Sequence, residues 1–217
     1  MRLGIVLRGI TARDQAGIPS IGGKPNMRDW NLCKDNIKEK LIDPMKSLHD
    51  VTTYLTTYKG SPVEDLEKFY DPTSVFLLDY EGSHQRITMI KSIYQIRDEP
   101  IDFVISTRFD LEFFKSVSEY NFDFNKFNFL YKEIEPNWTN SKFVSDCFFA
   151  FPIKYAESFI EAITNEFKHP SRVGYTDMHN AYVRMKEVIG EENLHFIHDA
   201  PHPVREGENE YIKIIRI

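Results

Sequence analysis

Charged side chains follow an apolar run in the segment IDFVISTRFDLEF, residues 101–113. The apolar residues reach Ile105, and Arg108 and Asp110 come shortly after it. A carboxylate at the end of a strand can hold Mn²⁺ or Mg²⁺ against a diphosphate, because these ions prefer oxygen ligands and the diphosphate supplies some of them. The arginine can contact phosphate directly. We therefore predict a metal–diphosphate site here, with a surface Arg/Asp pair that closes a turn as the alternative.

A second candidate site follows the first apolar run, in the residues Arg8, Gly9, Ile10 and Thr11. Glycine permits close approach of a ligand to the backbone, and arginine offers a planar fork of donors. A turn glycine beside a surface arginine is the alternative. The chain has neither G-x-G-x-x-G after this run nor G-x-x-x-x-G-K-[ST], which counts against dinucleotide enzymes and P-loop NTPases.

Potential metal ligands crowd into LHFIHDAPHPVR, residues 194–205, as His195, His198, Asp199 and His202. Histidine is the commonest metal ligand. Alternation along a regular strand would place His195 and His198 on opposite faces, so they would not share one ion. We expect one ligand among His198 and His202. One buried and two exposed histidines are the alternative.

The segment NWTNSKFVSDCFFAFP, residues 137–152, places Asp146 at the start of an apolar strand after a loop with Trp138 and Asn140. A carboxylate at the mouth of an aromatic pocket suits a general base or a group that binds a hydroxyl, and burial would raise its pKa. Aromatic faces also stack on the C–H surface of sugars. A carboxylate that caps the strand is the alternative.

Short apolar runs and helical spacings indicate the elements that would position these residues. We expect strands over 3–7, 51–57, 74–79, 101–106, 127–131, 146–151, 194–198 and 211–216. Helical stripes lie between them, over 31–48 with a kink at Pro44, over 83–96, from about Tyr155, and from about Thr176 to Gly190. Strands that alternate with helices predict an α/β fold with a mostly parallel sheet, and the second half reads as mixed.

Composition narrows the class of protein. The chain has 217 residues with a formal net charge of −6, so non-specific binding to nucleic acid or an anionic membrane is not expected. An aromatic fraction of 14% argues against disorder, and two cysteines make no disulfide framework. No apolar run approaches the ~20 residues of a membrane helix. We expect one domain over 1–217, without a transmembrane segment, in the cytoplasm.

Together these segments resemble the GT-A class of nucleotide-sugar glycosyltransferases, in particular the small single-domain enzymes of large algal DNA viruses. The resemblance rests on GIVLRG (4–9), FVISTRFDLEF (103–113), VSDCFFAF (144–151) and the histidines from His195 onward. The family carries an Asp-x-Asp motif. In this chain Arg108 stands at the position of the first acid and only Asp110 matches the second.

The resemblance implies a GT-A-like fold with a nucleotide-binding half over about 1–113 and an acceptor half over about 114–217. It implies transfer of a sugar from a UDP-sugar such as UDP-glucose to a glycan hydroxyl, assisted by Mn²⁺ or Mg²⁺. The donor-binding residues would be Arg8, Gly9, Ile10, Thr11, Arg86, Arg108 and Asp110. Asp110 with His198 or His202 would hold the metal, and Trp138 and Asn140 would bind the acceptor. Asp146 would be the base of an inverting transfer, or would bind the acceptor hydroxyl in a retaining one.

Two other functions stay open on the sequence. A metal-dependent phosphoester or nucleotide hydrolase would use the late His/Asp cluster. A non-catalytic nucleotide-sugar-binding module would keep the fold without turnover, which the missing first acid favours.

Overall fold

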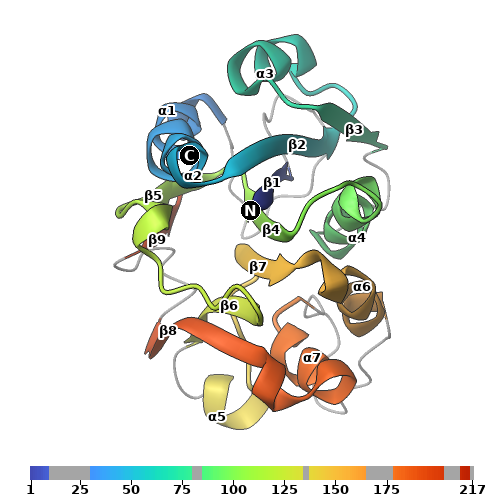
Figure 1. Ribbon diagram of the computed structural model, residues 1–217, viewed down its shortest axis with the longest axis vertical. Coiled ribbons are helices and arrows are strands. Elements are labelled where there is room, and N and C mark those ends of the chain that lie inside the picture. Colours follow the sequence, from blue (N-terminus) through green and yellow to red (C-terminus); the bar gives the residue numbers. More distant parts are fainter. Residues whose placement is uncertain (10–29, 80–84, 134–136, 165–177, 203–210, 216–217) are drawn as a thin grey trace, which may run out of the picture.

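The computed structural model describes residues 1–9, 30–79, 85–133, 137–164, 178–202 and 211–215. The chain forms a seven-stranded sheet in the order β3-β2-β1-β4-β7-β6-β8, flanked by helices (Figure 1). Its strands are β1 (Arg2–Arg8), β2 (Asp50–Tyr58), β3 (Ser74–Leu78), β4 (Phe103–Arg108), β6 (Phe127–Glu133), β7 (Phe148–Pro152) and β8 (Leu194–His202). A separate pair joins β5 (Leu111–Phe113) to β9 (Ile212–Ile214). The predicted α/β class with a mostly parallel sheet is confirmed.

The direction of the strands decides which residues meet. β1 runs parallel to both β2 and β4, and β3 runs parallel to β2. β7 runs antiparallel to β4 and β6, and β8 runs parallel to β6. The carboxyl ends of β1, β4, β6 and β8 therefore share one edge of the sheet with the amino end of β7. Strands of both halves of the chain belong to this sheet, which gives the mixed character expected of the second half.

Helices cover both faces of the sheet. One face packs on α1 (Lys34–Ile37) and α2 (Asp43–Leu48), and the other on α4 (Gln85–Ile96), α6 (Ala156–Thr164) and α7 (Ala181–Ile189) (Figure 1). Two apolar cores result, because alternate strand residues point to opposite faces. On β4, Phe103 and Ile105 belong to the first core and Val104 to the second.

Two helical predictions need correction. The helix expected to kink at Pro44 contains a π-helical turn, Lys38–Ile42, just before α2. Proline has no N–H to donate four residues back, which favours such a turn there. On α4 the buried face carries Met89, Ile93 and Ile96. Tyr94, which the helical spacing over 83–96 placed on the apolar face, is exposed.

The structure also contains elements that the sequence did not predict, namely α3 (Val63–Tyr70), α5 (Asn137–Ser141) and the strand β5. Among the described residues, no helix is both long enough and apolar enough to cross a membrane.

Candidate functional site

Two arginines end the two strands at the centre of the sheet. Arg8 closes β1, Arg108 closes β4, and the two residues are partners in the parallel register. The chain proceeds from β1 to β2 and β3 on one side, and β4 lies on the other side of β1. Ligands of open α/β sheets bind in the crevice at such a reversal, outside the carboxyl ends of the strands. The sequence-predicted residues Arg8 and Arg108 therefore lie where a ligand site is expected.

Arg8 is buried, with 1% of its surface exposed. Its Nη2 donates to the backbone oxygen of Asp146 at 2.6 Å, while its Nε has no hydrogen-bond partner among the described residues. Burial lowers the pKa of Arg8 to about 10, Asp146 opposes this shift, and the nearby Arg108 adds to it. The guanidinium stays charged at neutral pH and retains a donor for an anionic group.

Gly9 follows Arg8 and has a φ of +111°, a backbone conformation that residues other than glycine rarely adopt. Its N–H donates to the Thr56 oxygen at 3.0 Å, and its own carbonyl accepts from Thr57 Oγ1 at 2.9 Å. The turn is thus fixed to β2. Ile10 and Thr11 lie outside the described residues.

Arg108 and Asp110 form a bidentate ion pair, with Nε–Oδ1 at 2.7 Å and Nη2–Oδ2 at 2.6 Å. Each side chain is 5% exposed. We had expected Asp110 at an open strand end, but it is buried and both of its oxygens contact Arg108. Arg108 explains the difference, because a buried cation needs a carboxylate partner.

Asp146 lies just before β7 and reaches the same edge of the sheet because β7 is antiparallel to β4. Its Oδ1 is 3.9 Å from Arg108 Nη1, and Cys147 Sγ donates to the same oxygen at 3.3 Å. With its amide oriented to satisfy both contacts, Gln85 of α4 donates to Asp146 Oδ2 and accepts from Arg108 Nη1 at 2.8 Å. Asp146 is therefore brought together with both arginines.

The expected rise in the pKa of Asp146 is wrong. Burial does raise it, but the positive charges of His179, Arg108 and Arg8 together outweigh burial and hold the pKa below its usual value. Asp146 is therefore an ionised carboxylate at neutral pH.

Like Gln85, two further residues of this network, His179 and Glu133, were not predicted. His179 Nδ1 lies 2.6 Å from Glu133 Oε1 and 3.1 Å from the Val144 oxygen, and its Nε2 lies 3.7 Å from Asp146 Oδ2. Glu133 is the buried last residue of β6, so its position at the end of an apolar run was a usable signal. His179 lies just before α7, outside any pattern that we recognised.

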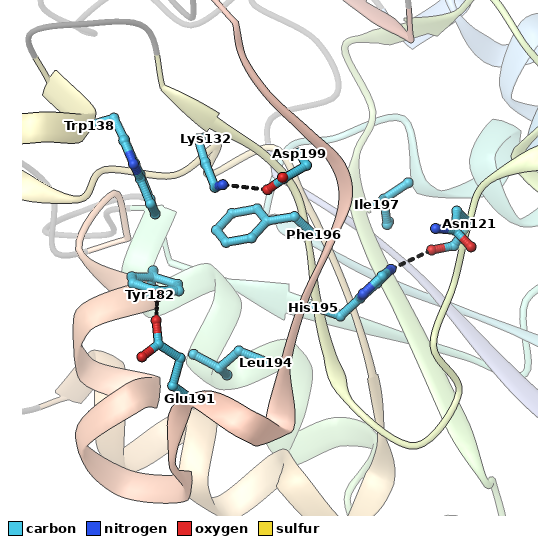
Figure 2. Close-up of a pocket in the computed structure, with 10 residues that line it drawn as sticks. All are labelled: Asn121, Lys132, Trp138, Tyr182, Glu191, Leu194, His195, Phe196, Ile197 and Asp199. Carbon is cyan, nitrogen blue, oxygen red and sulfur yellow. Dashed lines mark hydrogen bonds and ion pairs between the residues drawn. The ribbon is translucent and has the colours of Figure 1, made fainter.

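The remaining predicted residues lie elsewhere. Arg86 is half-buried in the first turn of α4. In α5, Asn140 is exposed, whereas Trp138 is half-buried and lines a pocket beside Tyr182 and Phe196 (Figure 2).

The late His/Asp cluster does not converge on one point in its described part. His195 Nε2 lies 2.7 Å from the Asn121 oxygen, Asp199 pairs with Lys132, and the His198 ring packs on Tyr211 at 4.9 Å. The side chain of His202 is not described. This spread gives no support to the hydrolase alternative.

The described residues do not fit a divalent cation. Within them, no three His, Cys, Asp or Glu side chains gather as a metal site. The two oxygens of Asp110 contact Arg108, and those of Asp146 face Arg108 and His179. The positive charges at this edge are side-chain cations, which compete with a metal for the same carboxylates.

Comparison with protein-family models and with curated proteins finds no match for this chain.

Proposed function

We propose that this protein is a GT-A-like glycosyltransferase that moves a sugar from a UDP-sugar to a hydroxyl of a glycan. The observation that carries the proposal is that Arg8 and Arg108 are neighbours in the strand register at the reversal point of the sheet. In addition, Arg8 Nε has no hydrogen-bond partner among the described residues. Two guanidinium groups at such a crevice suit the diphosphate of a nucleotide sugar.

In this proposal the arginines act on the leaving group. The bond between the sugar C1 and the diphosphate oxygen breaks while the acceptor oxygen bonds to C1, and negative charge grows on the diphosphate. Arg8 contacts that charge, and Arg108, held rigid by Asp110, supports it. Fixed cations in a buried site stabilise such charge without reorganising during the reaction. Gly9 leaves room beside them, since a Cβ there would meet no atom of the described residues within 4 Å.

Asp146 receives the acceptor in this scheme. Its lowered pKa makes it a weak base, so it orients the acceptor hydroxyl and accepts the proton late, when the bond to the diphosphate is largely broken. No step is assigned to the Mn²⁺ or Mg²⁺ that the sequence suggested, because the described residues do not fit a divalent cation.

The test is calorimetric binding of UDP together with release of UDP from UDP-glucose, using Arg8→Gln. Loss of a charge-assisted contact of about 1.5–3 kcal/mol should weaken UDP binding on the order of ten- to a hundredfold. Arg2→Gln is the matched control, because Arg2 begins the same strand and pairs with Asp102 at the opposite edge of the sheet.

Arg8→Lys retains the charge without the planar fork and checks the result if Arg8→Gln is unstable. UDP that binds the folded Arg8 variants as tightly as the wild type would refute the proposal. UDP binding without release of UDP from any UDP-sugar would instead favour the non-catalytic module.

A further inference from the structure

A second candidate site lies beside the edge strand β8, between α5 and α7. It is a pocket of about 540 Å³. Three aromatic rings, those of Trp138, Tyr182 and Phe196, face one another on one side of it, and His195 lies on the other side of β8 beside Asn121 (Figure 2). Its volume falls within the range of small-molecule sites.

The aromatic rings present surfaces at several angles. The ring centre of Trp138 lies 5.2 Å from that of Tyr182 and 5.5 Å from that of Phe196, and the ring planes are inclined by 58° and 89°. Lys142 Nζ lies 4.9 Å from the centre of the indole ring and Lys132 Nζ 5.2 Å from it, which helps to fix the ring. Trp138 is half-buried, so part of this surface contacts solvent.

The charges that line the pocket are compensated. Lys132 pairs with Asp199, and Glu191 accepts from Tyr182 Oη and pairs with Lys186, each at 2.5 Å. The carboxylates still offer acceptor oxygens, since the side chain of Asp199 is 84% exposed and that of Glu191 is 59% exposed. Such a lining favours a neutral ligand with apolar C–H faces and several hydroxyl groups over a phosphorylated one.

The pocket adjoins the ion network at the end of β6. Lys132 lines the pocket, and the next residue, Glu133, contacts His179 of the network. The Lys142 N–H donates to the Trp138 oxygen, and the chain then continues through Val144 to Asp146.

We propose that this pocket binds an uncharged oligosaccharide and holds the acceptor glycan. This inference rests on the proposed glycosyltransferase function. The aromatic rings contact the C–H faces of one sugar, Asp199 and Glu191 accept from its hydroxyls, and a further sugar unit extends toward Asp146. An oligosaccharide is therefore the expected class, because the ligand contacts both the pocket and Asp146.

The chain provides its own reporter, because it has two tryptophans, and Trp30 is buried under the other face of the sheet. Titration with neutral trisaccharides (cellotriose, maltotriose, mannotriose and chitotriose) should change the fluorescence of the wild type. Trp138→Phe, which leaves only Trp30, should lose that signal. Glucose 6-phosphate, as a charged comparison, should give no change.

Affinity is then measured by calorimetry with the best trisaccharide. Phe196→Leu and Tyr182→Leu remove aromatic surface from the pocket and should weaken binding about tenfold. Tyr94→Leu is the matched control, because Tyr94 is an exposed ring on α4 and does not line the pocket. This control should bind the trisaccharide like the wild type.

UDP affinity is measured on the same wild-type sample. Trisaccharide binding that is absent, or that is unchanged in Trp138→Phe, Phe196→Leu and Tyr182→Leu alike, would overturn the inference while UDP binding still upheld the donor site. Trisaccharide binding without UDP binding would uphold the sugar pocket and overturn the glycosyltransferase proposal.

Discussion

Raising the pH from 6.5 to 8 should weaken the fold, because it removes the proton that gives His179 its charged contacts with Glu133 and Asp146. Burial lowers the pKa of His179, but the carboxylates of Asp146 and Glu133 outweigh burial and raise the pKa to about 9. A group with a higher pKa in the folded state stabilises fully below its unfolded pKa of ~6.5, and that contribution is lost as the pH rises through the folded value. The contribution of His179 should fall from about 3 kcal/mol at pH 6.5 to about 1 kcal/mol at pH 8.

The measurement is urea denaturation at several pH values between 6.5 and 8, with His179→Gln beside the wild type. The wild type should lose about 2 kcal/mol more than the variant over this interval. Above pH 8 the Cys147 thiol, whose pKa burial raises to about 12, would add its own loss. His49→Gln is the control. Burial lowers the pKa of His49, so the effect of His49 on stability changes with pH below this interval rather than within it. Equal pH dependence in the wild type and His179→Gln would refute the assignment of a protonated His179.

The remaining predictions concern the same edge of the sheet. Asp110→Asn leaves Arg108 buried without its carboxylate and should lower the free energy of unfolding by about 3–5 kcal/mol, measured in urea; an unchanged midpoint would contradict the buried pair. Gly9→Ala should cost about 1–2 kcal/mol from backbone strain, because no atom of the described residues obstructs a Cβ there, and a silent variant would mean that the turn relaxes. Asp146→Asn should retain UDP affinity while sugar transfer falls by orders of magnitude, and a product with retained anomeric configuration would remove Asp146 as the base. UDP affinity in EDTA should match that with Mn²⁺, since Arg8 supplies the contact, whereas a strong gain with Mn²⁺ would restore the metal site.

The strands were predictable because they are nearly continuous apolar runs, as expected for a sheet buried on both faces. All six residues of β4 are buried, for example, and they match the predicted run closely. The short strand β5 was less accessible, because its three residues are defined by pairing with β9 about a hundred positions later. Helix α3 was missed because it is only 8 residues long and its buried face carries only Leu66 and Tyr70.

The candidate site was predictable where its residues lie at the ends of strands. Arg8, Arg108 and Asp146 were all identified from charges that interrupt apolar runs, and the structure brings them together. The pKa of Asp146 was not predictable, because it depends on three cations from distant parts of the sequence. His179 was missed for the same reason, since its role arises from contacts with Glu133 and Asp146 rather than from a local motif.

The central position of β1 bears on how the chain folds as it is synthesised. β1 is synthesised well before β4, one of its two neighbours in the sheet, which follows about a hundred residues later, with Leu3 pairing to Phe103. Until β4 arrives, β1 has an unpaired edge with apolar residues on both faces, the state in which nascent chains associate with one another. Non-local pairing of this kind is also slow. The protein should therefore depend on chaperones during synthesis, and chains truncated before β4 should aggregate.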